Sequence, residues 1–420
     1  MKFIHAADLH LDAPFRGLSR YEGAPLERIR QAGRIAFERL VRACLEHQVD
    51  FLLLAGDLFD GSGKDFNTVL YMASHMRRLM EAKIEVFAVL GNHDAEHDLL
   101  KTNPFTSNVH LFAAEYAQTI HRQHLGVAVH GQSHASRSEK RNLAAGYPPA
   151  VPEAFNIGLL HTSLTGRDGH EPYAPCNEDD LVAHGYDYWA LGHVHQREWV
   201  RRQDPMIHYP GTLQGRHIHE SGEKGATLIE MDASGKLHEH PLAFNPVRWQ
   251  ILEIKLDEIE SFNDFLDRTV EQMGRLVNPK VLTVVRLLLT GPCQWHGLLI
   301  AKGMDLEQEL RIQTLKAGGD ALWLERVENK SHPKHADQPK PTAGNLDPLT
   351  LIEQLAQELR SSENGLQSLA EELKPLRSFL AGATLRGDKT LHLQDTQWLG
   401  QALTQAEFLV RQRLLDRGDR

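Results

Sequence analysis

Five short apolar runs in the first part of the chain each end in polar side chains. The runs cover residues 2–7, 51–55, 84–90, 155–160 and 186–191. Runs of this length and composition are typical of buried strands. Longer stretches with helical periodicity separate the early runs, as the crossover connections between parallel strands require. The pattern therefore predicts an α/β fold with parallel strands in its core.

The polar residues that follow these runs form compact motifs. They are Asp8-Leu9-His10, Gly56-Asp57, Gly91-Asn92-His93-Asp94, His161 and Gly192-His193-Val194-His195. Open α/β sheets place their ligand sites at the carboxyl ends of the strands. We therefore expect these motifs to converge on one site.

The side chains in the motifs are suited to binding metal ions. Carboxylates, an amide oxygen and imidazoles, without cysteine, favour Mn²⁺, Fe or Zn²⁺ over a thiolate zinc site. The i, i+2 spacing of Asp8 and His10 lets both side chains reach one ion, and Asp57 is the natural bridging carboxylate. Two ions about 3.5–4 Å apart can stabilise both the attacking and the leaving oxygen at a phosphate ester.

Taken singly, most of these motifs have ordinary alternatives. An Asp-x-His tripeptide is common in solvated loops, and Gly-Asn is ordinary turn chemistry. The chain also contains 25 histidines, so an isolated histidine is more often part of the surface or the core than a ligand. The metal hypothesis depends on all five motifs occurring together, each behind a strand-like run.

In this order, the motifs resemble the calcineurin-like metallophosphoesterase superfamily, which implies a two-sheet sandwich flanked by helices. The resemblance assigns one metal to Asp8, His10, Asp57 and His195. It assigns the second metal to Asp57, Asn92, His161 and His193. In the family, the residue that matches His93 contacts the scissile phosphate and protonates the leaving oxygen. Asp94 is expected to orient His93 by accepting its other N–H.

Composition indicates a soluble protein of two or three domains. The chain has 420 residues and a formal net charge of −10, whereas free-standing DNA-binding proteins are usually basic. We find neither a signal peptide nor an apolar run of about 20 residues, and three dispersed cysteines favour a reducing compartment. These features predict a cytoplasmic location. Two basic clusters could bind phosphate: Arg137, Lys140 and Arg141, and Arg201 with Arg202. Such clusters are more often ordinary solvated surface than phosphate contacts.

The patterning predicts four regions. Residues 1–246 form the catalytic domain, in which 207–211 and 226–231 are expected to be strands of a second sheet. The segment 211–220 borders either the active site or solvent, and Arg216 and His217 are its substrate-binding candidates. Strand and helix patterns over 247–330 indicate a small α/β capping domain. Residues 331–347 have linker composition, and 348–420 carry amphipathic helical stripes, with Gly365 as a possible break.

This domain order resembles the SbcD-type DNA repair exonuclease subunits, and the segments 1–15 and 209–220 resemble the YhaO branch. The resemblance implies a Mn²⁺-dependent DNA nuclease that pairs with a coiled-coil, SbcC-like ABC-type ATPase through its C-terminal helices. It also implies a homodimer. Archaeal and eukaryotic relatives carry histidine where this chain has Asp60, so the role of that histidine does not transfer.

Three functions are compatible with the sequence. The first is a DNA nuclease subunit, which the capping domain and the helical tail favour. The second is a phosphatase or phosphodiesterase for a small nucleotide or phosphoester, which the acidic net charge favours. The third is a metal-free scaffold, against which the full ligand set and His93 argue.

Overall fold

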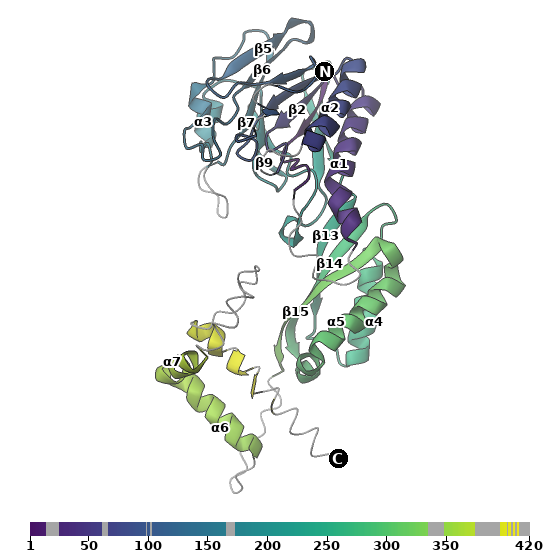
Figure 1. Cartoon of the computed structure of the whole chain (residues 1–420), viewed down its shortest axis with the longest axis vertical. Helices are drawn as coiled ribbons and strands as arrows, with labels where there is room; N and C mark the ends of the chain where they lie inside the picture. Colours follow the sequence, from purple (N-terminus) through teal and green to yellow (C-terminus); the bar gives the residue numbers. More distant parts are fainter. Residues whose placement is uncertain are drawn as a thin grey trace. The chain divides into compact units, whose positions relative to one another are not determined.

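The computed structural model describes residues 1–13, 25–60, 66–97, 99–100, 103–164, 173–334, 348–373, 395–400, 402–404, 406–407 and 410. The chain divides into two compact units, drawn in Figure 1. The first unit comprises Met1–Gln250 and Asn278–Val284, and the second comprises Ile251–Val277 and Val285–Arg420. The boundary expected at residue 246 stays a prediction. Within the described residues, no helix combines the length and the apolar character needed to cross a membrane.

The first unit contains two six-stranded sheets. The first sheet has the order β12-β11-β1-β2-β3-β4, in which β1 to β4 are parallel and β11 and β12 are antiparallel additions. Its strands are β1 (Lys2–Ala6), β2 (Phe51–Ala55), β3 (Glu85–Val89), β4 (Val109–Leu111), β11 (Gly225–Met231) and β12 (Leu237–Ala243). Helices α1 (Leu26–Glu46) and α2 (Phe66–Glu81) provide crossovers between the parallel strands and pack against this sheet.

The second sheet also has parallel strands in the middle, but it carries an antiparallel strand at each edge. Its order is β5-β6-β7-β8-β10-β9, and β6, β7, β8 and β10 are parallel. Its strands are β5 (Gln118–Arg122), β6 (Val127–Gly131), β7 (Phe155–His161), β8 (Tyr188–Gly192), β9 (Glu198–Arg201) and β10 (Met206–Tyr209). The short helix α3 (Glu178–Val182) precedes β8.

One apolar core lies between the two sheets. Phe3, Phe51 and Phe87 come from the first sheet and pack against Ile157 and Tyr188 of the second, and all five are fully buried. The rings of Phe3 and Phe51 stack with their centroids 5.0 Å apart. The two sheets thus form a sandwich held together by apolar and aromatic contacts.

The second unit includes most of a three-stranded sheet of order β13-β14-β15. Strands β13 (Val247–Lys255), β14 (Leu282–Cys293) and β15 (Leu322–Pro333) alternate with helices α4 (Phe262–Gly274) and α5 (His296–Gly318). Phe265, Leu287 and Leu310 belong to the apolar cluster between sheet and helices. Helices α6 (Pro348–Ser361) and α7 (Glu363–Glu372) follow.

The predicted fold class is confirmed, and three details differ from expectation. Residues 226–231 join the first sheet, antiparallel to β1, and not the second. The helical tail breaks at Ser362, whose side chain caps α7 by accepting a hydrogen bond from the backbone N–H of Gly365. Helix α5, which is kinked at Gly303, is much longer than the helix that the pattern predicts around residues 305–310. Residues 335–347 of the expected linker and 408, 409 and 414 of the last apolar stripe lie outside the described residues.

Candidate metal centre

The five motifs lie at the carboxyl ends of β1, β2, β3, β7 and β8, where His161 and Gly192 are the last strand residues and the others occupy tight turns. Asp8, Asp57 and His193 have backbone φ angles of 52°, 52° and 103°, in the left-handed region that non-glycine residues rarely adopt. The neighbouring glycines permit close approach of these turns. A Cβ at Gly91 would lie 2.2 Å from Oδ1 of Asp57, and one at Gly192 would lie 1.8 Å from the carbonyl oxygen of Ala55. Strained turns of this kind are typical of functional sites.

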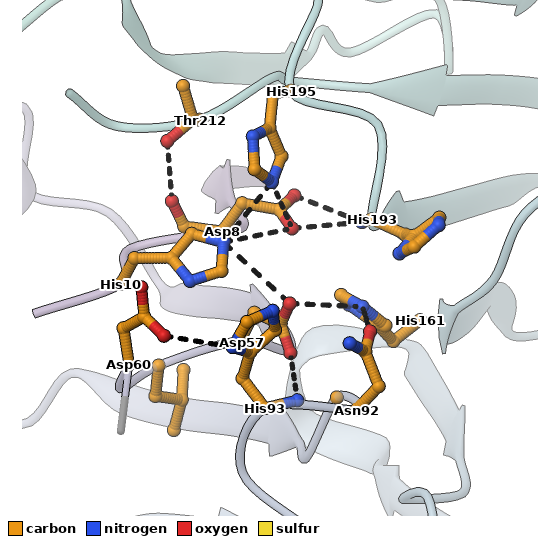
Figure 2. Close-up of polar contacts among 12 residues, drawn as sticks. Asp8, His10, Asp57, Asp60, Asn92, His93, His161, His193, His195 and Thr212 are labelled. Atoms are coloured by element: carbon orange, nitrogen blue, oxygen red, sulfur yellow. Dashed lines mark hydrogen bonds and ion pairs between the residues drawn. The ribbon is translucent and has the colours of Figure 1, made fainter. Parts of the chain in front are cut away.

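All seven predicted ligands lie in one cluster at the carboxyl ends of the strands (Figure 2). Oδ2 of Asp57 lies 3.7 Å from Nε2 of His10 and 3.5 Å from Nε2 of His161, so it is placed between two histidines. On the first side, Nε2 of His195 lies 3.1 Å from Nε2 of His10 and 3.6 Å from Oδ1 of Asp8. The geometry therefore suits Asp57 for the bridging position.

On the second side, hydrogen-bond acceptors face one another. Nδ1 of His161 is 2.9 Å from the carbonyl oxygen of Ala55 and donates to it, so Nε2 carries a lone pair. That Nε2 faces Oδ1 of Asn92 at 3.0 Å and Oδ2 of Asp57 at 3.5 Å. On the first side, the backbone N–H of His193 donates to both carboxylate oxygens of Asp8, at 3.1 and 3.0 Å, and so holds that carboxylate in place. Lone pairs that converge in this way fit a bound cation.

Burial and like charge give the cluster unusual pKa values. Burial, with Asp57 nearby, raises the pKa of Asp8 well above its usual range. Burial, with Asp94 nearby, raises the pKa of Asp57 to about 7. Burial likewise holds the pKa values of His10 and His161 well below the usual range, so both imidazoles are neutral at pH 7. The neutral imidazoles match the protonation state that divalent metals require of their ligands, whereas the two carboxyl groups must release their protons when a metal binds.

His93 is paired with Asp60, and the predicted role of Asp94 is wrong. Nδ1 of His93 donates to Oδ1 of Asp60 at 3.0 Å, and this hydrogen bond raises the pKa of His93. Asp94 instead accepts backbone N–H groups of Leu58 and Phe59 at 2.9 Å each, and of Gly91 at 3.1 Å. Asp94 thus fixes the two turns that carry Asp57 and Asn92, while the distant Asp60 orients His93.

A cleft of about 490 Å³ opens onto the cluster and includes both substrate-binding candidates. Arg216 is held between two carboxylates, with Nη1 3.1 Å from Oδ2 of Asp60 and Nη2 3.2 Å from Oε1 of Glu220. His217 also lines the cleft, with 55% of its side chain exposed. The segment 211–220 therefore borders the site rather than bulk solvent alone.

The basic clusters separate into one cleft residue and several surface pairs. Arg137 is exposed and lines the cleft. Lys140 is exposed and is not among the cleft-lining residues. The other three arginines pair with carboxylates: Arg141 with Glu139, Arg201 with Glu178, and Arg202 with Glu239.

Several site residues were missed by the sequence motifs. Thr212 donates to the backbone oxygen of Asp8 at 2.7 Å, which holds the first turn in place (Figure 2). The others line the cleft and are Tyr173, Gln196, His219, Glu220 and Lys224. No local pattern marks these residues, since their positions depend on how distant loops meet. The only signal was the density of Gly, His and Arg over residues 211–220.

The comparisons with known proteins agree with this geometry. Residues 1–197 match the calcineurin-like phosphoesterase family, and residues 249–332 match the middle domain of metallophosphoesterase YhaO. A Bacillus subtilis protein named as an uncharacterized metallophosphoesterase, YhaO, is 34% identical over 335 residues, covering 79% of this chain and 82% of that protein. The fold and the donor set of the present chain agree with those of a metallophosphoesterase.

More distant relatives are named as DNA double-strand break repair proteins Mre11. The Methanopyrus kandleri protein is 25% identical, covering 83% of this chain and 74% of its own length. The Methanocaldococcus jannaschii protein is 23% identical, covering 64% of this chain and 73% of its own length. The chain belongs to the calcineurin-like metallophosphoesterase family, as a YhaO-like member.

Proposed function

We propose that the chain is a dinuclear-metal phosphodiesterase that cleaves DNA, with Mn²⁺ as its metal. The observation that carries this proposal is the convergence of seven buried or half-buried donors beside the hydrogen-bonded pair His93 and Asp60. Asp8, His10, Asp57 and His195 would hold one ion, and Asp57, Asn92, His161 and His193 the other. When bound, such ions stabilise the negative charge that develops on the phosphate oxygens.

The protein's own residues supply the proton and orient the ester. His93 lines the cleft and presents Nε2 to the leaving oxygen, while its Nδ1 donates to Asp60. Asp60 thereby fixes the ring orientation in which His93 acts as the general acid. Arg216, anchored by Asp60 and Glu220, presents a guanidinium beside His93 that binds the non-bridging phosphate oxygens.

Two further cations support a substrate with more than one phosphate. Arg137 lines the cleft, and its positive charge contributes to the lowered pKa of Asp60. Lys224 is only 4% exposed, and its Nζ donates to neutral oxygens of His195 and Gln196 at 3.2 and 3.4 Å. Positive charges that line the cleft suit the phosphates that flank a scissile bond in a polynucleotide. The Mre11 names of the distant relatives point to the same substrate.

The expected partners belong to this proposal. Helices α6 and α7 would bind the coiled-coil ABC-type ATPase, and Leu351 and Leu355 on α6 expose 41% and 55% of their surface. On α2, Phe66 and Leu70 are 61% and 66% exposed and are our candidates for the homodimer contact. Exposed apolar residues at helical spacing are typical of interaction surfaces.

A second candidate, hydrolysis of a small phosphoester, is favoured by the net charge of −10. The deciding experiment compares linear duplex DNA with bis(p-nitrophenyl) phosphate, both with Mn²⁺. We expect hydrolysis of both substrates, and of neither by Asp57→Ala, which should empty both metal positions. Cleavage of the ester with no degradation of DNA, even with the ATPase present, would support the small-substrate function. If neither substrate were cleaved, the scaffold hypothesis would stand.

A further inference from the structure

Glu220 connects a metal-ligand candidate to the candidate phosphate-binding arginine. Its carboxylate is buried at 6% exposure, at the end of the short 3-10 turn Ile218–Glu220. Oε1 lies 2.6 Å from Nδ1 of His195 and 3.2 Å from Nη2 of Arg216. Oε2 accepts the backbone N–H of Arg216 at 2.7 Å. We propose that Glu220 is a positioning residue that holds His195 for one metal ion and Arg216 for the substrate phosphate.

The first half of the role concerns which nitrogen of His195 is available to a metal. Because the carboxylate only accepts hydrogen bonds, Nδ1 of His195 must be the donor, and Nε2 is left with its lone pair. Nε2 is the atom that faces Asp8 and His10, at 3.6 and 3.1 Å. Glu220 thus fixes both the tautomer and the direction of this ligand.

The second half concerns the guanidinium of Arg216. Glu220 accepts hydrogen bonds from the backbone N–H and from Nη2 of Arg216, and Asp60 accepts one from Nη1. Asp60 also accepts the N–H of His93. A continuous series of hydrogen bonds therefore runs from His195 through Glu220, Arg216 and Asp60 to His93, and it links one metal position to the candidate general acid.

A purely structural role is the alternative. The backbone N–H of Glu220 donates to the carbonyl of His217 at 2.9 Å, so the residue also closes its own turn. In that case, replacing Glu220 should lower the melting temperature and leave metal binding unchanged. The test therefore needs metal affinity as its readout, with a matched buried glutamate as control.

The experiment titrates the metal-free full chain with Mn²⁺ alone, and counts bound ions by equilibrium dialysis and electron paramagnetic resonance. Glu220→Ala and Glu220→Gln are compared with Glu325→Gln. Glu325 is 7% exposed, is paired with Arg286 within the second unit, and is not among the residues that line the cleft. The inference rests on the proposed function, because the wild-type chain must bind two ions for any difference to be measured.

We expect Glu220→Ala to lower the affinity for one of the two Mn²⁺ ions about 10–100-fold, which is the usual effect of losing the hydrogen-bond partner of a metal ligand. The affinity for the other ion should stay near wild type. Glu220→Gln retains one acceptor oxygen, so its loss should be smaller. Hydrolysis of the diester should also show a higher KM, since Arg216 is released. Glu325→Gln should bind both ions normally.

Three results would overturn the inference. The first is that Glu220→Ala binds both ions with wild-type affinity. The second is that both positions weaken equally. The third, for the case in which Glu220→Ala does not fold, is a Glu220→Gln variant that binds metal like Glu325→Gln. A wild-type chain that binds no Mn²⁺ would instead reject the proposed function itself.

Discussion

At the scale of single residues, His93 allows proton delivery to be separated from metal binding. His93→Asn should lower kcat for a dinucleotide about 10²–10⁴-fold, because its alkoxide leaving group needs a proton. The activity of the variant toward bis(p-nitrophenyl) phosphate should fall much less, since p-nitrophenolate leaves as a stable anion. Steady-state rates on both substrates, with Mn²⁺ counted per chain, check the prediction. Loss of bound metal in this variant would mean that His93 is a ligand rather than an acid.

Asp60 and Asp94 should have different mutant phenotypes. Asp60→Asn removes the charged partner of His93, so kcat for the dinucleotide should fall while the melting temperature stays near wild type. Asp94→Ala leaves three buried backbone N–H groups unsatisfied, at about 1–3 kcal/mol each, so stability and metal binding should fall together. Thermal melting and metal counts distinguish the two variants. Wild-type melting of Asp94→Ala with reduced kcat would restore the original assignment.

The hydrogen-bond partner of His93 could not be predicted from the sequence, which suggests Asp94 where the structure has Asp60. Asp94 follows His93 directly, and this adjacency suggested a pair. The two side chains diverge at a tight turn, however, and Asp94 points back to the turn after β2. Asp60, 33 positions away in the chain, reaches His93 because β2 and β3 are neighbours in the sheet. A partner set by sheet order carries no local signal.

At the scale of elements, two buried histidines link the sheets and should make stability depend on pH. His5 on β1 and His208 on β10 have ring centroids 5.6 Å apart. Nε2 of His208 forms a hydrogen bond of 2.8 Å with Oγ1 of Thr227 on β11. Burial holds the pKa of His5 well below its usual range and lowers the pKa of His208 to about 3. Both rings are therefore neutral in the folded protein.

The direction in which stability changes with pH follows from how many protons the folded and unfolded chains bind. In the unfolded chain each histidine binds a proton below about pH 6.5, whereas the folded chain does not until far lower pH. Each of the two histidines should therefore lower stability by about 1.4 kcal/mol per pH unit as the pH decreases below about 6.5, while the raised pKa values of Asp8 and Asp57 act in the opposite direction. Urea unfolding of metal-free protein between pH 7 and 5 measures this slope. His208→Gln should reduce it, and an unchanged slope would contradict the prediction.

Element types were more predictable than element partners. The strand–helix–strand order of the second unit follows the hydrophobic pattern closely, because each element buries one apolar face. The extent of α5 was underestimated, since Gly303 interrupts its periodicity with a φ of 41°. The place of β11 beside β1 was also missed. Both sheets share one core, and an apolar strand pattern fits either of them.

At the scale of the whole molecule, an acidic chain must attract a polyanion through local positive charge. Arg137→Gln should raise the KM for duplex DNA and reduce the slope of log affinity against log salt by about 0.9, as expected for one lost phosphate contact. Lys140→Gln is the matched control, because it is exposed nearby and does not line the cleft. Equal effects of the two substitutions would show that only net charge matters.

Recognition of the site as a whole succeeded because its parts are ordered along the chain. Each motif follows its own strand, so a linear pattern was enough to gather Asp8, Asp57, His161 and the other ligands. Glu220 and Lys224 could not be found in this way. They enter the cleft from the connection between β10 and β11, whose path over the sandwich depends on the packing of both sheets.

The ligand turns after β1, β2 and β3 belong to one sheet, and those after β7 and β8 belong to the other. An ion held by Asp57 and His161 would consequently connect the two sheets of the sandwich. Binding of metal would therefore stabilise the folded first unit. At a thousandfold excess over its Kd, each ion would add about 4 kcal/mol against separation of the two sheets. Chelation should accordingly loosen the first unit and leave the second unit's melting transition where it was.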